Sequence, residues 1–229
     1  MCIRDSPETD YSAEDRKDRD IKTRLLEINK IAATYYYHQL KSEAGKSGLD
    51  YLVKRGLSDK TINSFGLGYA PQSTGELYRM LKDKGYDDGI LKESGLFTYE
   101  KGVRDKFWNR VIFPIMDINN KVIGFGGRVM GDAKPKYLNS PETKLFDKSR
   151  NLYGLNAART ARKNNLIICE GYMDVISLHQ AGFTQAVASL GTALTPGHAR
   201  LMKRYTDNVL ITLSLIHISE PTSRSYISY

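Results

Sequence analysis

The sequence predicts an α+β N-terminal half followed by an α/β domain whose parallel sheet is truncated after its third strand. Two patterns carry this prediction. In the first half, apolar residues recur at steps of three and four, which is typical of amphipathic helices. From residue 165 onward, short apolar runs alternate with helical patterns in the order β-α-β-α-β, which is typical of a doubly wound parallel sheet.

Helices dominate the predicted first half. An amphipathic helix is expected over residues 21–43, and a shorter one over 49–55 is followed by a glycine that stops it. Ser58 is a typical N-cap for the next short helix. Two more short helices are expected over 76–84 and 88–93, because each pattern ends close to a glycine.

A hairpin and a basic loop are expected to complete this half. Residues 110–117 and 121–129 are rich in β-forming residues, and the asparagines between them tolerate the turn conformations that a hairpin requires. A basic, proline-punctuated loop then runs to about residue 150. Its cations can neutralise phosphates, although a solvated basic face is the commoner reason for such a pattern. They are Arg128, Lys134, Lys136, Lys144, Lys148 and Arg150.

The second half is expected to place acidic residues at the edge of the parallel sheet. Its predicted elements are a helix over 156–163, then strand 166–169, helix 174–181, strand 185–189, helix 195–205 and strand 208–212. Ligands of such sheets bind beyond the carboxyl ends of the strands. Glu170 stands directly at the end of the first strand, and Asp174 lies one helical turn further on.

A carboxylate in that place can act as a general acid or base, or ligate Mg²⁺ through its oxygens. For Asp174 the alternative is a structural one, an acidic residue that favours the N-terminus of a helix. The segment Gly191-Thr192-Ala193 follows the second strand. Its backbone amides can approach a phosphate, or the segment is a plain strand-to-helix turn.

Charge and composition favour a basic protein of the reducing cytosol. Lys and Arg number 34 against 26 Asp and Glu, so the net charge is +8, which favours polyanionic partners such as nucleic acid. The run Tyr35-Tyr36-Tyr37 can stack bases, but at helical spacing such residues belong more often to the core. Cys2 and Cys169 are the only cysteines, which excludes a disulfide framework and a cysteine-rich zinc cluster. With no apolar run of membrane-spanning length, we expect a cytoplasmic protein with no membrane partner.

The two ends are expected to be an adapter-like artefact at residues 1–6 and 213–229. A DNA string that encodes Met-Cys-Ile-Arg-Asp-Ser at the start has a reverse complement that encodes Leu-Ser-Leu-Ile-His from residue 213. Two ends related in this way are improbable in a natural protein, so neither segment is expected to belong to the native fold. We therefore expect Thr212 to be the last residue of the native segment.

Five strings of the interior resemble motifs of the bacterial DnaG-type DNA primase core. They are Arg-Gly-Leu-Ser at 55–58, Gly-Phe-Gly-Gly-Arg at 124–128, Pro-Lys-Tyr-Leu-Asn-Ser-Pro-Glu-Thr at 135–143, Leu-Tyr-Gly-Leu at 152–155 and Glu-Gly-Tyr-Met-Asp-Val at 170–175. The order and spacing of the strings also agree with that family, and the similarity covers nearly all of residues 20–212.

The resemblance implies a domain organisation. Residues 7–48 would form a linker and helix, 49–164 the N-terminal subdomain of an RNA-polymerase-like core, and 165–212 an incomplete TOPRIM domain with a Rossmann-like sheet. The zinc-binding N-terminal domain and the helicase-binding C-terminal domain of the family have no counterpart in this sequence. The family's Asp-x-Asp motif would follow the third TOPRIM strand, where residues 213–216 read Leu-Ser-Leu-Ile.

The resemblance also implies an activity, the DNA-templated synthesis of short RNA primers for replication by a nucleotidyltransferase of the primosome. The implied partners are single-stranded DNA, ribonucleoside triphosphates and the replicative helicase, in the bacterial cytoplasm at the nucleoid. Glu170 would be the acid/base, and Glu170 with Asp174 would face Mg²⁺ or Mn²⁺. Template and nucleotide contacts map to Arg55, Arg110, Arg128 and Lys136. Without the Asp-x-Asp motif, we expect the chain as written to make no primers.

Two alternatives remain open on the sequence. The first is another TOPRIM enzyme, such as a topoisomerase, a nuclease or a phage primase-helicase. The second is a noncatalytic module that binds single-stranded nucleic acid, in which the basic loop matters and Glu170 is structural. Charge reversal at Lys136 and at Glu170 in the full-length protein separates the binding module from an enzyme, because a binding module would lose affinity through Lys136 and would not respond to the change at Glu170.

Overall fold

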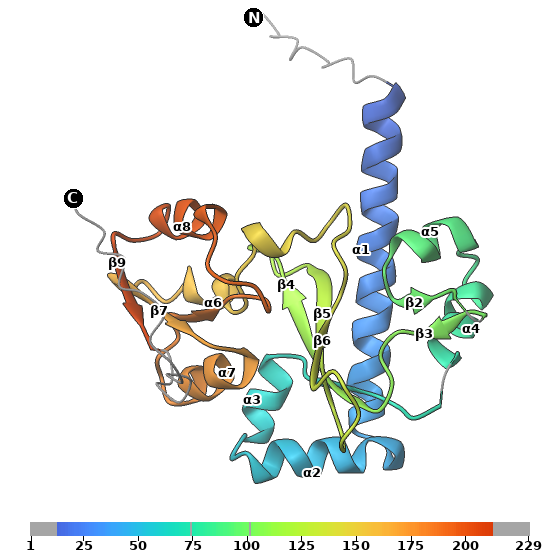
Figure 1. Ribbon diagram of the computed structural model, residues 1–229, viewed down its shortest axis with the longest axis horizontal. Helices are drawn as coiled ribbons and strands as arrows, with labels where there is room; N and C mark the ends of the chain where they lie inside the picture. The colour runs from blue at the N-terminus through green and yellow to red at the C-terminus, as the bar shows by residue number, and fades with distance from the viewer. Residues whose placement is uncertain (1–12, 74, 101, 213–229) are drawn as a thin grey trace, which may run out of the picture.

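The computed structural model describes residues 13–73, 75–100 and 102–212 (Figure 1). The segments 1–6 and 213–229, which we expect to be adapter-like, lie outside these residues. In Figure 1 a long helix and an antiparallel sheet occupy the middle of the molecule, and a parallel sheet lies at one end. The predicted fold class, an α+β part followed by an α/β part, is confirmed.

The N-terminal part contains a four-stranded antiparallel sheet in the order β1-β4-β5-β6. Small helices and a two-stranded ribbon surround it, and each predicted short helix is present. The bounds are α1 Ala13–Leu40, η1 Glu43–Gly45, α2 Lys46–Lys54, α3 Asp59–Ser64, β1 Gly68–Ala70, α4 Glu76–Asp83, α5 Asp88–Glu93, β2 Phe97–Thr98, β3 Arg104–Asp105, β4 Arg110–Met116, β5 Val122–Val129, β6 Tyr137–Asn139 and η2 Lys148–Arg150.

Helix α1 starts earlier than predicted, at Ala13 instead of residue 21, and ends at Leu40. Its first two turns carry charged residues and almost no apolar ones, so the apolar period that revealed the rest could not reveal them. Tyr36 is buried and packs edge-on against Phe125 at 5.6 Å between ring centroids, so this member of the tyrosine run belongs to the core. No helix within the described ranges has both the length and the apolarity needed to cross a membrane.

The predicted hairpin is confirmed, with β4 and β5 pairing antiparallel. One oxygen of the Asp117 carboxylate accepts the backbone N–H groups of Asn119 and Lys121, at 2.8 and 2.9 Å. Asn120 takes the left-handed conformation with φ 60°, which asparagine tolerates better than most residues. An asparagine therefore takes the left-handed turn conformation, as the sequence predicted for this hairpin.

The basic loop is more ordered than predicted. Tyr137–Asn139 forms strand β6, which pairs antiparallel with the Gly126–Arg128 stretch of β5. A strand of three residues next to Pro135 and Pro141 gives no clear alternation, so the sequence pattern indicated only a loop. The pairing brings the Lys-Tyr-Leu-Asn string beside the Gly-Gly-Arg string.

The second part contains the predicted β-α-β-α-β unit. Both neighbours of β7 run parallel to it, in the order β8-β7-β9. Helix α6 is shorter than the helix predicted over 156–163, because the chain leaves the helix before Arg162, which has φ 50°. The bounds are α6 Leu155–Ala158, β7 Asn165–Cys169, α7 Tyr172–Gln180, β8 Ala186–Ala188, α8 Pro196–Lys203 and β9 Asn208–Ile211.

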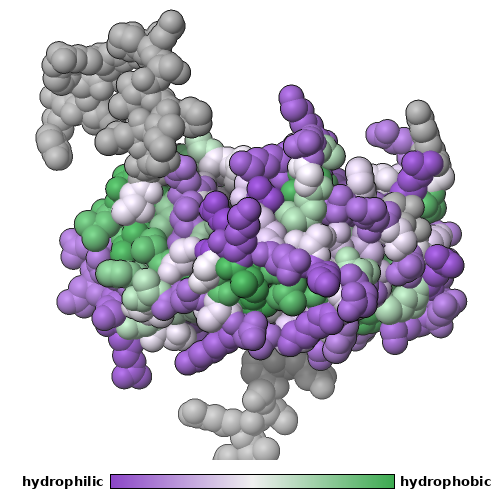
Figure 2. All heavy atoms as spheres, turned by 90° about the horizontal axis from the view of Figure 1, so that it is seen from below, coloured by the Kyte–Doolittle hydropathy of each residue, from purple (hydrophilic) through white to green (hydrophobic). Residues whose placement is uncertain are grey.

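Strand β9 carries exposed apolar side chains, and Leu210 and Ile211 are 53% and 60% exposed. Figure 2, the view from below, shows hydrophobic surface toward the end of the molecule that holds this sheet and a second hydrophobic patch near the middle, both among hydrophilic residues. Burial is stronger on β7, the central strand, and on β8, the other edge strand.

One hydrophobic core joins the two parts. Phe113 of β4 stacks on Tyr172 of α7 with ring centroids 4.9 Å apart, and Tyr153 meets the same ring edge-on at 4.7 Å. The backbone of Tyr153 also pairs with that of Ala188, at the end of β8. Aromatic contacts of this kind add about 0.5–1.5 kcal/mol each beyond the area they bury. The relative position of the two sheets is therefore set by packed side chains.

Candidate functional site

Glu170 lies where the sequence predicts, at the carboxyl end of β7 and just before α7. Its side chain is exposed and lines a cavity of about 380 Å³. Gly171, the N-cap of α7, has extended backbone angles and separates the strand from the helix. The end of a parallel strand thus delivers a carboxylate into a cavity, the usual ligand position in such sheets.

Asp174 lines the same cavity from the first turn of α7. One of its oxygens accepts the N–H of Gly171 at 3.2 Å, which is the structural role of an acidic residue at a helix N-terminus. The carboxylate therefore caps the helix and also lines the cavity, and its role toward Mg²⁺ stays a prediction.

Other residues that line the same cavity come from the N-terminal part. Arg55 extends from the turn between α2 and α3, and Tyr137 and Asn139 come from β6. The nearby guanidinium groups of Arg55 and Arg128 partly oppose the burial that raises the pKa of the Tyr137 hydroxyl. A cavity lined by cationic, aromatic and carboxylate side chains suits a ligand that carries both a base and phosphates.

Asn139 joins the two parts at the cavity. Its amide nitrogen donates to the carbonyl of Leu190 at 2.8 Å, and its oxygen accepts the hydroxyl of Tyr172 at 2.7 Å. Gly191, with φ 75°, follows in a conformation that favours glycine, and a Cβ there would lie 2.9 Å from the Asn139 amide nitrogen. Gly191 therefore lines the cavity within a strand-to-helix turn that Asn139 holds.

Arg128 and Lys136 do not line the cavity, but both are neighbours of Tyr137, which does: Arg128 pairs with Tyr137 between β5 and β6, and Lys136 precedes it in the chain. The Arg128 guanidinium lies 4.1 Å from the ring centroid of Tyr51, a cation–π contact that restricts its position. Its Nη1 also donates to the carbonyl of Val129 at 3.3 Å. Lys136 is exposed next to β6. Their predicted role in phosphate binding stays a prediction.

Arg110 differs from the other three predicted basic contacts because it is only 3% exposed. Its Nη1 donates to the carbonyl of Pro135 at 3.0 Å and to that of Gly127 at 3.3 Å. The guanidinium therefore supports the segment that leads to Lys136 from inside. Arg110 is therefore placed to support the backbone and is not exposed for direct contact with a phosphate.

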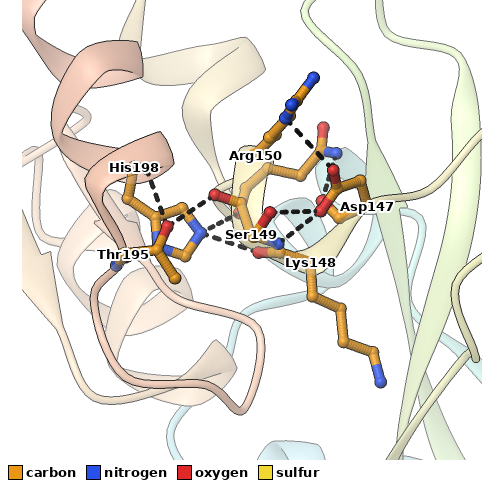
Figure 3. Close-up of polar contacts among 7 residues, drawn as sticks. Asp147, Lys148, Ser149, Arg150, Thr195 and His198 are labelled. Carbon is orange, nitrogen blue, oxygen red and sulfur yellow. Dashed lines mark hydrogen bonds and ion pairs between the residues drawn. The ribbon is translucent and has the colours of Figure 1, made fainter.

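The segment that carries Lys148 and Arg150 is held by the start of α8 (Figure 3). His198 is fully buried, and its Nε2 lies 2.8 Å from the Lys148 carbonyl and 3.2 Å from the Asn151 carbonyl. Thr195 donates its hydroxyl to the Ser149 carbonyl at 2.8 Å. The cationic side chains of this segment thus project from a backbone fixed by the parallel-sheet domain.

Gln180, at the end of α7, makes another contact between the two parts, and no sequence pattern indicated it. Its amide oxygen accepts the backbone N–H and the hydroxyl of Ser58 at 2.8 and 3.0 Å, and its amide nitrogen donates to the Gly56 carbonyl at 2.8 Å. The partners are separated by 122 and 124 positions, so no local pattern could indicate them.

A family model for the N-terminal domain of the DNA primase catalytic core matches residues 35–159. The chain belongs to the DnaG family of DNA primases. A second model, for the Toprim domain, matches residues 164–215 and includes Glu170, Asp174 and the whole parallel sheet. The predicted resemblance to DnaG primases is confirmed, because the first match separates this chain from Toprim proteins of other classes.

Relatives agree with this assignment. The chain is 50% identical over 198 residues to a DNA primase of Clostridium acetobutylicum, which covers 86% of this chain and 33% of that protein. A solved DnaG primase catalytic domain bound to single-stranded DNA is 40% identical, with a TM-score of 0.79, and the match covers 86% of this chain and 62% of that one.

The RNA polymerase domain of the Mycobacterium tuberculosis primase DnaG is 32% identical, with a TM-score of 0.80, over 83% of this chain and 66% of that one. This chain therefore spans about a third of the length of the curated primases it matches.

Mg²⁺ is the cofactor that the primase resemblance implies for the Glu170 cavity. Across the described ranges, no group of three or more His, Cys, Asp or Glu side chains is placed to hold a metal ion. Two carboxylates nevertheless line one cavity, and Mg²⁺ often takes only one or two protein carboxylates with water and substrate phosphates as its other ligands. The donor set of Glu170 and Asp174 is thus compatible with Mg²⁺ bound together with a phosphate ligand.

Proposed function

We propose that the protein containing this chain is a DNA primase, which synthesises short RNA primers on single-stranded DNA for replication. One observation carries the proposal. Glu170, at the carboxyl end of β7, shares a cavity with Arg55 and Tyr137 of the N-terminal part. This supports the proposal, because a carboxylate able to act as an acid or base lines the same cavity as groups that suit phosphates and bases.

The reaction is the attack of a primer 3′-hydroxyl on the α-phosphate of a ribonucleoside triphosphate, with release of pyrophosphate. Glu170 takes the proton from the attacking hydroxyl, a role open to it because its carboxylate is exposed within the cavity. Mg²⁺ held by Glu170 and Asp174 would supply charge stabilisation at phosphorus. Arg55 neutralises phosphate charge in the same cavity.

Template binding is assigned to the basic surface beside this cavity. Lys136 is exposed next to β6, and Arg128 is held over the Tyr51 ring at 4.1 Å. The net charge of +8 supports attraction of a polyanion, and Tyr137, 41% exposed, offers a ring on which a base can stack. These features favour single-stranded DNA as the template partner.

The test uses a protein that contains this chain and measures ribonucleotide incorporation on a single-stranded DNA template. Glu170→Gln keeps the size of the side chain and removes the base, so we expect incorporation to fall by about 10²–10⁴-fold with DNA affinity retained. Lys136→Glu should weaken DNA binding and lower the salt dependence by about one phosphate contact. Full incorporation by Glu170→Gln would refute the proposed role of Glu170, whereas a parent protein that binds DNA but incorporates no ribonucleotide would favour the noncatalytic binding module.

A further inference from the structure

Gln180 links the parallel-sheet domain to the turn that carries Arg55. Gln180 is the last residue of α7, and its side chain makes three hydrogen bonds to the residues on either side of Leu57. Two of them, both 2.8 Å, join it to the main chain of Gly56 and Ser58, and the third, 3.0 Å, joins it to the Ser58 hydroxyl. Leu57 itself is buried, with 4% exposure. The side-chain amide therefore holds a turn whose centre is already anchored in the core.

The backbone at Arg55 has little freedom of its own. Helix α2 ends there, with the N–H of Gly56 donating to the Val53 carbonyl and that of Leu57 donating to the Leu52 carbonyl, at 2.8 and 3.1 Å. Gly56 has φ 82°, the left-handed conformation that commonly ends a helix. The Gly56 carbonyl then receives the Gln180 amide. The backbone at Arg55 is thus held by the last hydrogen bonds of α2 and by the Gln180 side chain of α7, and together they set the direction of the Arg55 side chain.

Helix α7 connects this contact to the carboxylates. Glu170 immediately precedes the N-cap of α7, Asp174 lies in its first turn, and Gln180 is its last residue. Nine helical residues span about 13 Å at about 1.5 Å of rise per residue. One rigid helix therefore sets how far the acidic end of the cavity lies from the point where the Arg55 turn is held.

We propose that Gln180 is a positioning residue that holds Arg55 at the cavity that Glu170 also lines, so that the Arg55 guanidinium meets the phosphates of the bound ligand. This inference rests on the proposed primase function. The group that Arg55 binds is a phosphate, which belongs either to a ribonucleoside triphosphate or to the DNA template. Gln180 itself touches neither ligand, and acts only through the turn at Gly56 and Ser58.

The test measures binding by the full 229-residue chain, so it does not depend on primer synthesis. One arm titrates GTP with Mg²⁺, and the other titrates a fluorescently labelled oligo-dT by anisotropy. The variants are Gln180→Ala, Arg55→Ala and the double variant. Gln180→Glu is a second probe of similar shape, which keeps the acceptor for Ser58 but loses the donor to Gly56. Ser177→Ala, an exposed position on the same helix, is the matched control.

We expect Arg55→Ala to lower the affinity for one or both ligands about tenfold, as loss of a charged hydrogen bond does. Gln180→Ala and Gln180→Glu should weaken the same ligand by about three- to tenfold, and Ser177→Ala should have no effect. The decisive result is the double variant, which should bind no more weakly than Arg55→Ala alone. The arm that responds identifies the triphosphate or the template as the source of the phosphate.

Two results would overturn the inference separately. If Arg55→Ala weakens binding but Gln180→Ala and Gln180→Glu do not, or if the losses add in the double variant, Gln180 does not act through Arg55. If Arg55→Ala binds both ligands normally, the phosphate-binding role of Arg55 in the proposed function fails, and the positioning role fails with it.

Discussion

Gly126→Ala should destabilise the protein strongly, because Gly126 packs directly against the ring of Tyr172. A Cβ at this position would lie 2.4 Å from Cζ, 2.5 Å from the hydroxyl oxygen and 2.7 Å from Cε2 of Tyr172. The ring has no room to retreat. Phe113 stacks on it, Tyr153 meets it edge-on, and its hydroxyl is bound to Asn139 at 2.7 Å.

The magnitude follows from these contacts. Forcing an extra methyl group into a packed core costs about 1–3 kcal/mol. Displacing the Tyr172 ring also strains its hydrogen bond to Asn139, which contributes about 1 kcal/mol more. We therefore expect the free energy of unfolding to fall by about 3 kcal/mol, equivalent to a loss of about 6–12 °C in Tm for a domain of this size.

Thermal melts and urea titrations followed by circular dichroism measure this effect. Gly131→Ala is the control, because Gly131 has φ 92° but nothing within 4 Å of a Cβ, so only backbone strain of about 1–2 kcal/mol applies. Tyr172→Ala relieves the clash, and the double variant with Gly126→Ala should be more stable than the sum of the single effects by about 1–3 kcal/mol. A Gly126→Ala protein that melts with the parent, or strictly additive effects, would refute the close approach.

Two further predictions concern buried polar groups. Burial raises the pKa of the Asp105 carboxyl, so the folded state favours the neutral form of this group. The stability that the neutral carboxyl contributes is complete below the unfolded pKa and is lost as the pH rises through the folded pKa. Urea midpoints measured from pH 3 to 7 should show that loss in the parent, and a parallel curve for Asp105→Asn would count against it. At His198, Nδ1 accepts the N–H of Thr195 at 3.2 Å, so Nε2 carries the proton that is donated to the Lys148 carbonyl. His198→Gln can keep that donor whereas His198→Asn cannot reach it, so the Asn variant should lose about 1 kcal/mol more of unfolding free energy, and equal losses would argue against the donor role.

Much of the fold could be predicted because it leaves a local period in the sequence. The β-α-β-α-β unit is an example, since each strand is a short apolar run and each helix shows its own spacing. The position of Glu170 followed directly, because the end of a parallel strand is a defined place. The first turns of α1 gave no such signal. There Asp18 pairs with Lys22 at 2.7 Å and with Lys144 at 2.9 Å, contacts that involve no apolar residue.

The parts of the site that escaped prediction depend on contacts between distant segments. Strand β6 is recognisable only beside β5, where glycines at 126 and 127 leave room for Tyr172 and Phe107. Arg110 has the same residue type as Arg55, and only the fold shows that one is buried and the other lines the cavity. Residue type and spacing therefore pointed to candidate residues, and only the tertiary contacts show which of them line the cavity.

The two links between the domains should fail in different ways, and this separates stability from geometry at the site. Tyr172 is buried among Phe113, Tyr153 and Gly126, so a change there removes packing and lowers stability before it alters the cavity. Gln180 lies at the surface, where a hydrogen bond contributes only about 0.5–1.5 kcal/mol to folding. A change at Gln180 leaves the core intact and releases only the turn that carries Arg55. Variants at Gln180 are therefore the cleaner probe of how the Toprim domain positions Arg55, and variants at Tyr172 the cleaner probe of how the two domains hold together.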